Sequence, residues 1–206
     1  LTAVRELPWG DPALACAEAR RLLAAQPLGA LTGGLASYLA GRPPVVTRTA
    51  ELHSWLLLDE APWTLKLNQL VASPLSGRRS ENVHDHMRPL VSLTLCGGYR
   101  QDYFDGDALR HYRLGDAFDL RDLPCGPGPS TRPGHAYAID PVTWHALTDF
   151  DDGTVTLCLY GPVCKRQITV FSTVSGRVES RTSYRVAQEG LVAHLRCEAG
   201  RREAAP

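Results

Sequence analysis

Hydrophobic residues follow two different spacings along the chain, and the change of spacing divides it into two parts. The first part has a helical pattern that begins at Asp11 and Pro12, a typical N-cap and first-turn pair. A second helix is predicted from Leu28 to Ala40, because Gly41 and the proline pair that follows it cannot continue a helix. We therefore predict an N-terminal helical region over residues 1–50, packed on the rest of the protein.

From Glu51 onward the pattern changes to short runs that are typical of β-strands. Turn-forming clusters such as Asp105-Gly106-Asp107 separate these runs at the short intervals expected of an antiparallel sandwich or barrel. We therefore predict a mainly β barrel over residues 51–175. Its predicted strands are Trp55–Leu58, Trp63–Val71, His84–Leu95, Gly98–Phe104, Ala136–Ile139 and Thr154–Tyr160.

The region after Cys164 carries weaker signals. Ile168–Val174 is predicted as a strand and Thr182–Val186 as another. The polar tail Ala199–Pro206 is expected to fray. Residues 176–206 are interpreted as a C-terminal extension, and they give no functional signal.

Composition and charge narrow the functional classes. The 206 residues fit a single domain with a helical appendage, and 22 basic residues balance 22 acidic ones. A chain without basic excess is not expected to bind nucleic acid, and no apolar run approaches the roughly 20 residues of a membrane span. Six cysteines without a Cys-x-x-Cys pair predict mostly buried free thiols. We expect a cytoplasmic protein that binds a small molecule.

Three histidines carry the main chemical signal. His84 and His86 are two residues apart, so in a strand both side chains lie on the same face and can share one ligand. Asp85 then points to the opposite face and is a poor metal ligand. His145 lies where a later strand begins and supplies a third ligand. Three imidazoles on one side of a cation leave coordination positions open, which is typical of a catalytic site.

At this point the chain resembles the cupin superfamily, which has a double-stranded β-helix (jelly-roll) fold. The resemblance covers about residues 51–170 and includes His84, His86, the Gly97-Gly98 pair and the second-motif histidine, His145. The glycines that open the two motifs are displaced by one residue, with Gly77 in the first. The glutamate of the first motif would fall at Leu90 or Val91, and neither side chain binds a metal.

A cupin with three histidines and no glutamate is similar to the thiol dioxygenase branch, whose metal is ferrous iron. The resemblance therefore implies Fe(II), dioxygen as co-substrate and an oxygenase that does not use 2-oxoglutarate. It also implies a catalytic role for Tyr160 on a late strand. Cys158 stands where that branch has a relay histidine, so the substrate stays open.

Other residues are candidates for substrate binding and for support of the metal ligands. Lys66 and Asn68 alternate with two leucines, so one register turns them into the barrel and the other turns them to solvent. Arg88 could clamp an anion or lie on the surface. Asp85 and Glu81 are candidates for orienting the ligand imidazoles.

Less specific interpretations remain open beside these. A non-redox isomerase or lyase, or a cupin that binds a small molecule without turnover, fits the same residues. Tyr160 could be a packed aromatic residue. The helices are expected to cover one mouth of the barrel, with a lid or a homodimer contact as alternatives. The remaining histidines are expected on the surface: His53, His111, His135 and His194.

Overall fold

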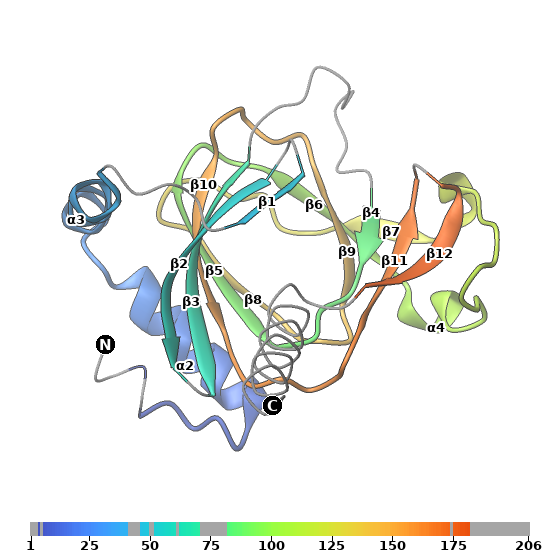
Figure 1. The fold of residues 1–206 in the computed structure, drawn as a ribbon, viewed down its shortest axis with the longest axis horizontal. Coiled ribbons are helices and arrows are strands. Elements are labelled where there is room, and N and C mark those ends of the chain that lie inside the picture. The colour runs from blue at the N-terminus through green and yellow to red at the C-terminus, as the bar shows by residue number, and fades with distance from the viewer. Residues whose placement is uncertain are drawn as a thin grey trace, which may run out of the picture.

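The computed structural model describes residues 4, 6–40, 46–49, 52–60, 62–70, 82–173 and 175–181, with the backbone alone for 46–49. Two six-stranded antiparallel sheets face each other (Figure 1). Sheet A has the order β1-β2-β3-β10-β5-β8, and sheet B has the order β12-β11-β4-β9-β6-β7. The strands of sheet A are β1 (Val46–Thr49), β2 (Leu52–Glu60), β3 (Trp63–Leu70), β5 (Leu90–Cys96), β8 (Ala136–Ile139) and β10 (Val155–Tyr160). Those of sheet B are β4 (Asn82–His84), β6 (Arg100–Phe104), β7 (Cys125–Pro127), β9 (Trp144–Thr148), β11 (Ile168–Ser172) and β12 (Arg177–Arg181).

The eight central strands pair as nested hairpins. β6 pairs with β7, β5 with β8, β4 with β9 and β3 with β10, all antiparallel. Apart from the β6–β7 pair, each step along these strands crosses from one sheet to the other. This is the connectivity of a jelly roll, so the predicted double-stranded β-helix with N-terminal helices is confirmed.

Helices α2 (Pro12–Ala24) and α3 (Leu28–Leu39) pack on the outer face of sheet A (Figure 1). The Asp11 carboxylate caps α2 by accepting from the backbone N–H groups of Ala13 and Leu14, as its position predicts. The expectation that the helices cover one mouth of the barrel is wrong. Their apolar residues bury the leucines that alternate outward from β3, β5 and β10.

A second apolar cluster covers the outer face of sheet B. Phe171 of β11 lies at its centre, with the rings of Tyr112, Phe118 and Trp144 against it edge to face. The short helix α4 (Gly106–Leu109) and the 3-10 turn η1 (Leu120–Asp122) belong to this side of the molecule. Both sheets therefore have large apolar clusters on their outer faces, whereas the inner faces combine polar residues with a smaller apolar cluster that contains Tyr137, Ile139 and Leu147.

The strand predicted over His84–Leu95 is wrong in one respect. It is broken into β4 in sheet B and β5 in sheet A, and residues 85–89 cross between the sheets. Pro89 accounts for the break, because proline offers no N–H to a ladder and restricts the residue before it. His86 therefore lies in the crossover and not in a strand.

Several other expectations have definite outcomes. The strand after Cys164 is present as β11, and β12 continues sheet B past residue 175. Of the five described cysteines, only Cys16 and Cys158 are buried, so the prediction of mostly buried thiols is wrong. No helix in the described part of the chain is long and apolar enough to span a membrane. Glu81, Thr182–Val186, His194 and Ala199–Pro206 lie outside the described residues.

Candidate metal centre

Strand pairing brings two of the three histidines together. His84 on β4 lies directly opposite His145 on β9, and opposite residues of an antiparallel pair share a face. The face is the inner one, because Val83 and Ala146, the neighbours in sequence, belong to the outer cluster of sheet B. His86 reaches the same place from the crossover that follows β4.

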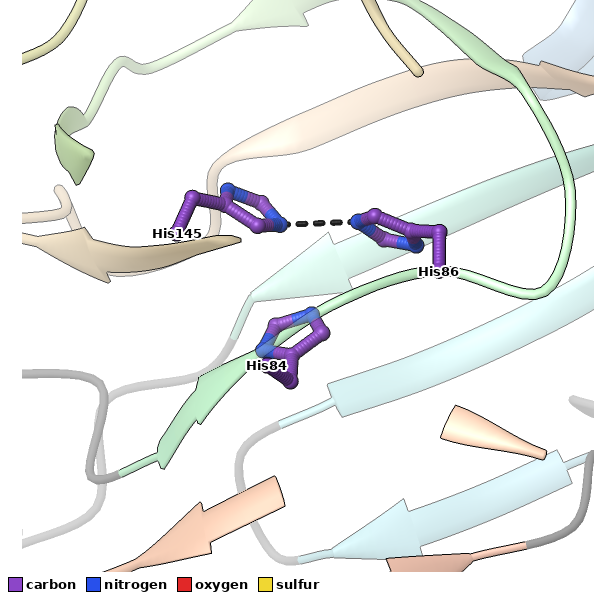
Figure 2. Close-up of side chains that lie close together, drawn as sticks. All are labelled: His84, His86 and His145. Atoms are coloured by element: carbon purple, nitrogen blue, oxygen red, sulfur yellow. Dashed lines mark hydrogen bonds between the residues drawn. The ribbon is translucent and has the colours of Figure 1, made fainter. Parts of the chain in front are cut away.

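The three imidazoles converge (Figure 2), with one potential ligand nitrogen from each within 4.8 Å of the others. The Nε2 atoms of His86 and His145 are 2.8 Å apart. Two nitrogens bound to one cation at about 2.1 Å and at right angles lie about 3 Å apart. The predicted ligands are thus brought to a spacing that one cation can bridge, and no other described residue joins the cluster.

In two of the three rings, Nδ1 forms a hydrogen bond to an acceptor outside the cluster. His84 Nδ1 donates to the carbonyl oxygen of Asn82 at 3.2 Å, and His145 Nδ1 donates to Gln101 Oε1 at 2.8 Å. An imidazole that carries its proton on Nδ1 has a lone pair on Nε2. Such outer hydrogen bonds are typical of histidines that bind metals. Gln101 was not among the predicted site residues, because nothing in its own strand marks it as a partner of His145, which lies 44 residues away in the sequence.

Burial keeps these rings neutral. It lowers the pKa of His84, and it holds the pKa of His86 and His145 well below the usual value, with the neighbouring histidines adding to the shift. For His86 the charge of Lys165 lowers the pKa further. Uncharged imidazoles are the form that binds a cation, so the donor set fits a metal.

Asp85 does not contact the histidine rings through a hydrogen bond. Its buried carboxylate is paired with Lys165 and accepts from the backbone N–H of Thr169 at 2.9 Å. Met87 O accepts from the N–H groups of Cys164 and Lys165. The crossover that carries His86 is therefore fastened to residues 161–169, and Asp85 supports the site through the backbone.

The inner face of sheet A carries several polar residues beside the apolar Leu90 and Ile139. Leu65 and Leu67 pack outward toward the helices, so Lys66 and Asn68 face into the barrel, which is one of the two registers left open by the sequence. Asn68 accepts from Ser54 Oγ at 2.7 Å and donates to Cys158 Sγ at 3.3 Å. Both ends of its amide are therefore engaged within the protein.

Further hydroxyl groups extend this network along sheet A. Thr156 and Ser92 contact the Cys158 thiol, and the hydroxyls of Tyr99 and Tyr137 form a hydrogen bond with each other. Burial raises the pKa of Cys158 and of both tyrosines, so all three stay protonated. We name this group of seven residues the sheet A network: Ser54, Asn68, Ser92, Tyr99, Tyr137, Thr156 and Cys158.

The remaining predicted site residues lie near the end of this inner face. Tyr160 is half-buried, and Lys66 Nζ lies 5.2 Å from the centre of its ring. Arg88 donates to Thr64 Oγ1 at 3.0 Å and to Gly161 O at 3.4 Å. These contacts place two cationic groups at the same end of β3 and β10, and their roles toward a substrate stay predictions.

The glycine pair of the resemblance has a structural reason. Gly97 has a φ of +67°, and a Cβ on Gly98 would lie 2.5 Å from the carbonyl oxygen of Thr131. The pair thus permits the tight turn between β5 and β6. Of the other described histidines, His111 is exposed as predicted, whereas His53 and His135 are half-buried.

No family model matches the chain, and no curated protein matches its sequence. Solved structures are similar in fold. DMSP lyase DddQ from Ruegeria pomeroyi DSS-3 is 12% identical, with 72% of this chain and 74% of that chain covered and a TM-score of 0.44. Ectoine synthase from P. lautus is 17% identical (56% and 67% covered, TM-score 0.38), and KdgF from Halomonas sp. is 10% identical (57% and 85% covered, TM-score 0.38). At such identities and scores these likenesses assign no activity to the chain.

Proposed function

We propose that this chain is a metal-dependent enzyme in which His84, His86 and His145 hold one ferrous iron for oxygen chemistry on a small polar molecule. One observation carries the proposal: three neutral imidazoles converge inside a polar barrel, and two of them are oriented by acceptors at Nδ1. In the metal-free protein the Nε2 atoms of His86 and His145 share one hydrogen bond, and a cation would replace that proton and bind the lone pairs of both nitrogens.

The ligand set distinguishes this site from sites that contain a carboxylate. Leu90 and Val91 occupy the positions where the cupin motif has its glutamate, and both side chains are buried. Three neutral ligands leave the charge of the cation uncompensated, which favours an anionic or strongly polar substrate. When bound, such a cation supplies a Lewis acid with open positions at which substrate and dioxygen meet.

The protein's own residues would bind and orient the substrate. Lys66 and Arg88 bring positive charge to one end of the inner face, and the hydroxyl of Tyr160 is the nearby candidate donor. The amide of Asn68 already has partners at both ends, so its proposed contact with a substrate requires one of them to be released. Arg88 likewise has partners, in Thr64 and Gly161, so we rank Lys66 and Arg88 above Asn68 only because their positive charge suits an anionic substrate.

A second candidate function is a non-redox lyase or isomerase that uses zinc. Three histidines with an open position are also a known catalytic ligand set for zinc, and this chain offers the same set. Iron and zinc differ in redox chemistry but not strongly in their preference for imidazole. The identity of the bound metal therefore separates the two functions.

The test is elemental analysis of protein purified without chelators and without oxygen. We expect about one iron per chain, lost in His84→Ala and His145→Ala and retained in the control His111→Ala, whose side chain is exposed. Oxygen uptake with a panel of small thiols, amino acids and hydroxy acids then tests the chemistry. Stoichiometric zinc without oxygen uptake would favour the second candidate. Wild-type protein without any metal would contradict both.

A further inference from the structure

Gln101 of β6 lies beside the metal centre and is 1% exposed. Its Oε1 accepts from His145 Nδ1 at 2.8 Å. Its Nε2 is also buried and has no hydrogen-bond partner in the part of the chain that the structure describes. The single hydrogen bond of this side chain is therefore directed to a candidate metal ligand.

This hydrogen bond decides which nitrogen of His145 carries the proton. A neutral imidazole holds one proton, and an acceptor at Nδ1 keeps it there, so the lone pair lies on Nε2. That nitrogen then accepts the hydrogen bond of 2.8 Å from His86 Nε2 in the metal-free protein (Figure 2). With the amide turned round, Nε2 of Gln101 would donate to His145 Nδ1. The proton would then occupy Nε2 of His145 and block a cation.

Packing alone does not explain a glutamine at this position. A leucine or methionine would fill a similar volume without burying an amide nitrogen that has no acceptor among the described residues, and such a group destabilises the folded state. His145 has another neighbour in Tyr103, whose ring centre lies 6.5 Å from that of the imidazole. Tyr103 fills space beside the ring, whereas Gln101 alone among the described residues accepts from its Nδ1.

We propose that Gln101 is a positioning residue that fixes the tautomer of His145 and so presents its Nε2 to the cation. The proposal rests on the proposed function, because it concerns the same metal site. A carboxylate at this place would also accept from Nδ1, but it would add a negative charge and make the imidazole a stronger donor. Glutamine thus orients the ligand and leaves the cation more electrophilic.

The first test is made on metal-free protein. Long-range proton–nitrogen NMR spectra of protein labelled with 15N-histidine report which nitrogen of each ring is protonated. We expect wild type and Gln101→Glu to carry the His145 proton on Nδ1. We expect Gln101→Leu to lose this preference. The control Tyr103→Phe keeps the ring and should leave the tautomer of His145 unchanged.

The second test measures affinity for cobalt(II) in competition with a coloured chelator. Gln101→Leu should bind cobalt about 10–100-fold more weakly than wild type, as is usual when a group that orients a ligand is lost. Gln101→Glu should bind at least as tightly as wild type. If Gln101→Leu does not fold, Gln101→Met makes the same comparison with an unbranched side chain.

The two tests separate the failure of this proposal from that of the proposed function. An unchanged Nδ1 tautomer in Gln101→Leu, or a cobalt affinity within twofold of wild type, would overturn the role of Gln101. If wild type binds no metal, the proposed function fails, and the NMR comparison still decides whether Gln101 sets the tautomer. A changed tautomer together with weaker cobalt binding supports the full proposal.

Discussion

The inner faces of the two sheets both carry polar groups, and these groups differ in their partners. On sheet A, the residues of the sheet A network are hydrogen-bonded to one another, as when Asn68 bridges Ser54 and Cys158, whereas the buried Thr94 Oγ1 has no partner among the described residues. On sheet B, His84 and His145 donate from Nδ1, and a hydrogen bond joins the Nε2 atoms of His86 and His145. Among the described residues, only these three imidazoles bring metal-binding nitrogens within 4.8 Å of one another. The difference separates a structural network from a binding site.

The largest effect should follow from removing a histidine of sheet B. Whole metal sites contribute roughly 10–16 kcal/mol, so one of three ligands accounts for about 4 kcal/mol, or about 1,000-fold in affinity. His145→Ala should therefore abolish retention of the metal, as measured by cobalt titration. Asn68→Ala on sheet A serves as the matched control. A similar loss of affinity in both variants would contradict the distinction between the two faces.

Acid should destabilise the metal-free protein through the same three histidines. Their folded-state pKa is lowered by burial, so below about pH 6.5 the unfolded state binds more protons than the folded state. Stability is then full above about pH 7 and falls toward pH 5.5, by about 1 kcal/mol for each histidine that stays neutral in the folded state. Urea unfolding between pH 7.5 and 5.5 measures this slope. The slope should shrink in His145→Ala, and an equal slope there would be inconsistent with this origin.

Breaking the ion pair that fastens the crossover should have an intermediate effect. Asp85→Asn removes the carboxylate that pairs with Lys165. Because the Lys165 side chain is 32% exposed, solvent screens its charge, and we expect the free energy of unfolding to fall by about 2 kcal/mol. The cobalt affinity should fall as well, because His86 lies in the same crossover. The double variant Asp85→Asn/Lys165→Met removes both charges and should recover part of the stability. No recovery would indicate that the charge pair is unimportant.

The smallest effect is expected within the sheet A network. Asn68→Ala removes hydrogen bonds to Ser54 and Cys158 and should lower the unfolding free energy by about 1 kcal/mol. Cobalt affinity should stay within twofold of wild type. Thermal unfolding and titration measure the two quantities. A larger change in affinity than in stability would mean that sheet A contributes to metal binding.

The fold and the cluster of three histidines could be predicted from the sequence, because each has a local signal in it. The alternation in β3 predicted a strand, but its register stayed open, since only the burial of Leu65 and Leu67 under the helices decides which face is inner. The His-x-His pair was found, although the assumption of one continuous strand was wrong. His86 reaches the site from a crossover that Pro89 creates.

Other features left no local mark. Gln101 contacts His145 across 44 residues of sequence, and Asp85 meets Lys165 across 80. Nothing in either segment alone indicates such a partner, because the strand order of the jelly roll determines which residues become neighbours. The positions of the helices were also mispredicted. An apolar helix face indicates that the face is buried, but it does not indicate which surface of the protein covers it.

The nested pairing of the strands also has a consequence for how the chain reaches its folded state. Each hairpin from β6–β7 outward encloses a longer loop, and His84 meets His145 only when β4 has paired with β9. Contacts between residues so distant in sequence form slowly, because the chain loses much conformational entropy before these contacts contribute favourable free energy. We therefore expect the metal centre to assemble late in folding. A cation bound there stabilises the fully folded chain relative to any partly folded state in which β4 and β9 are not yet paired.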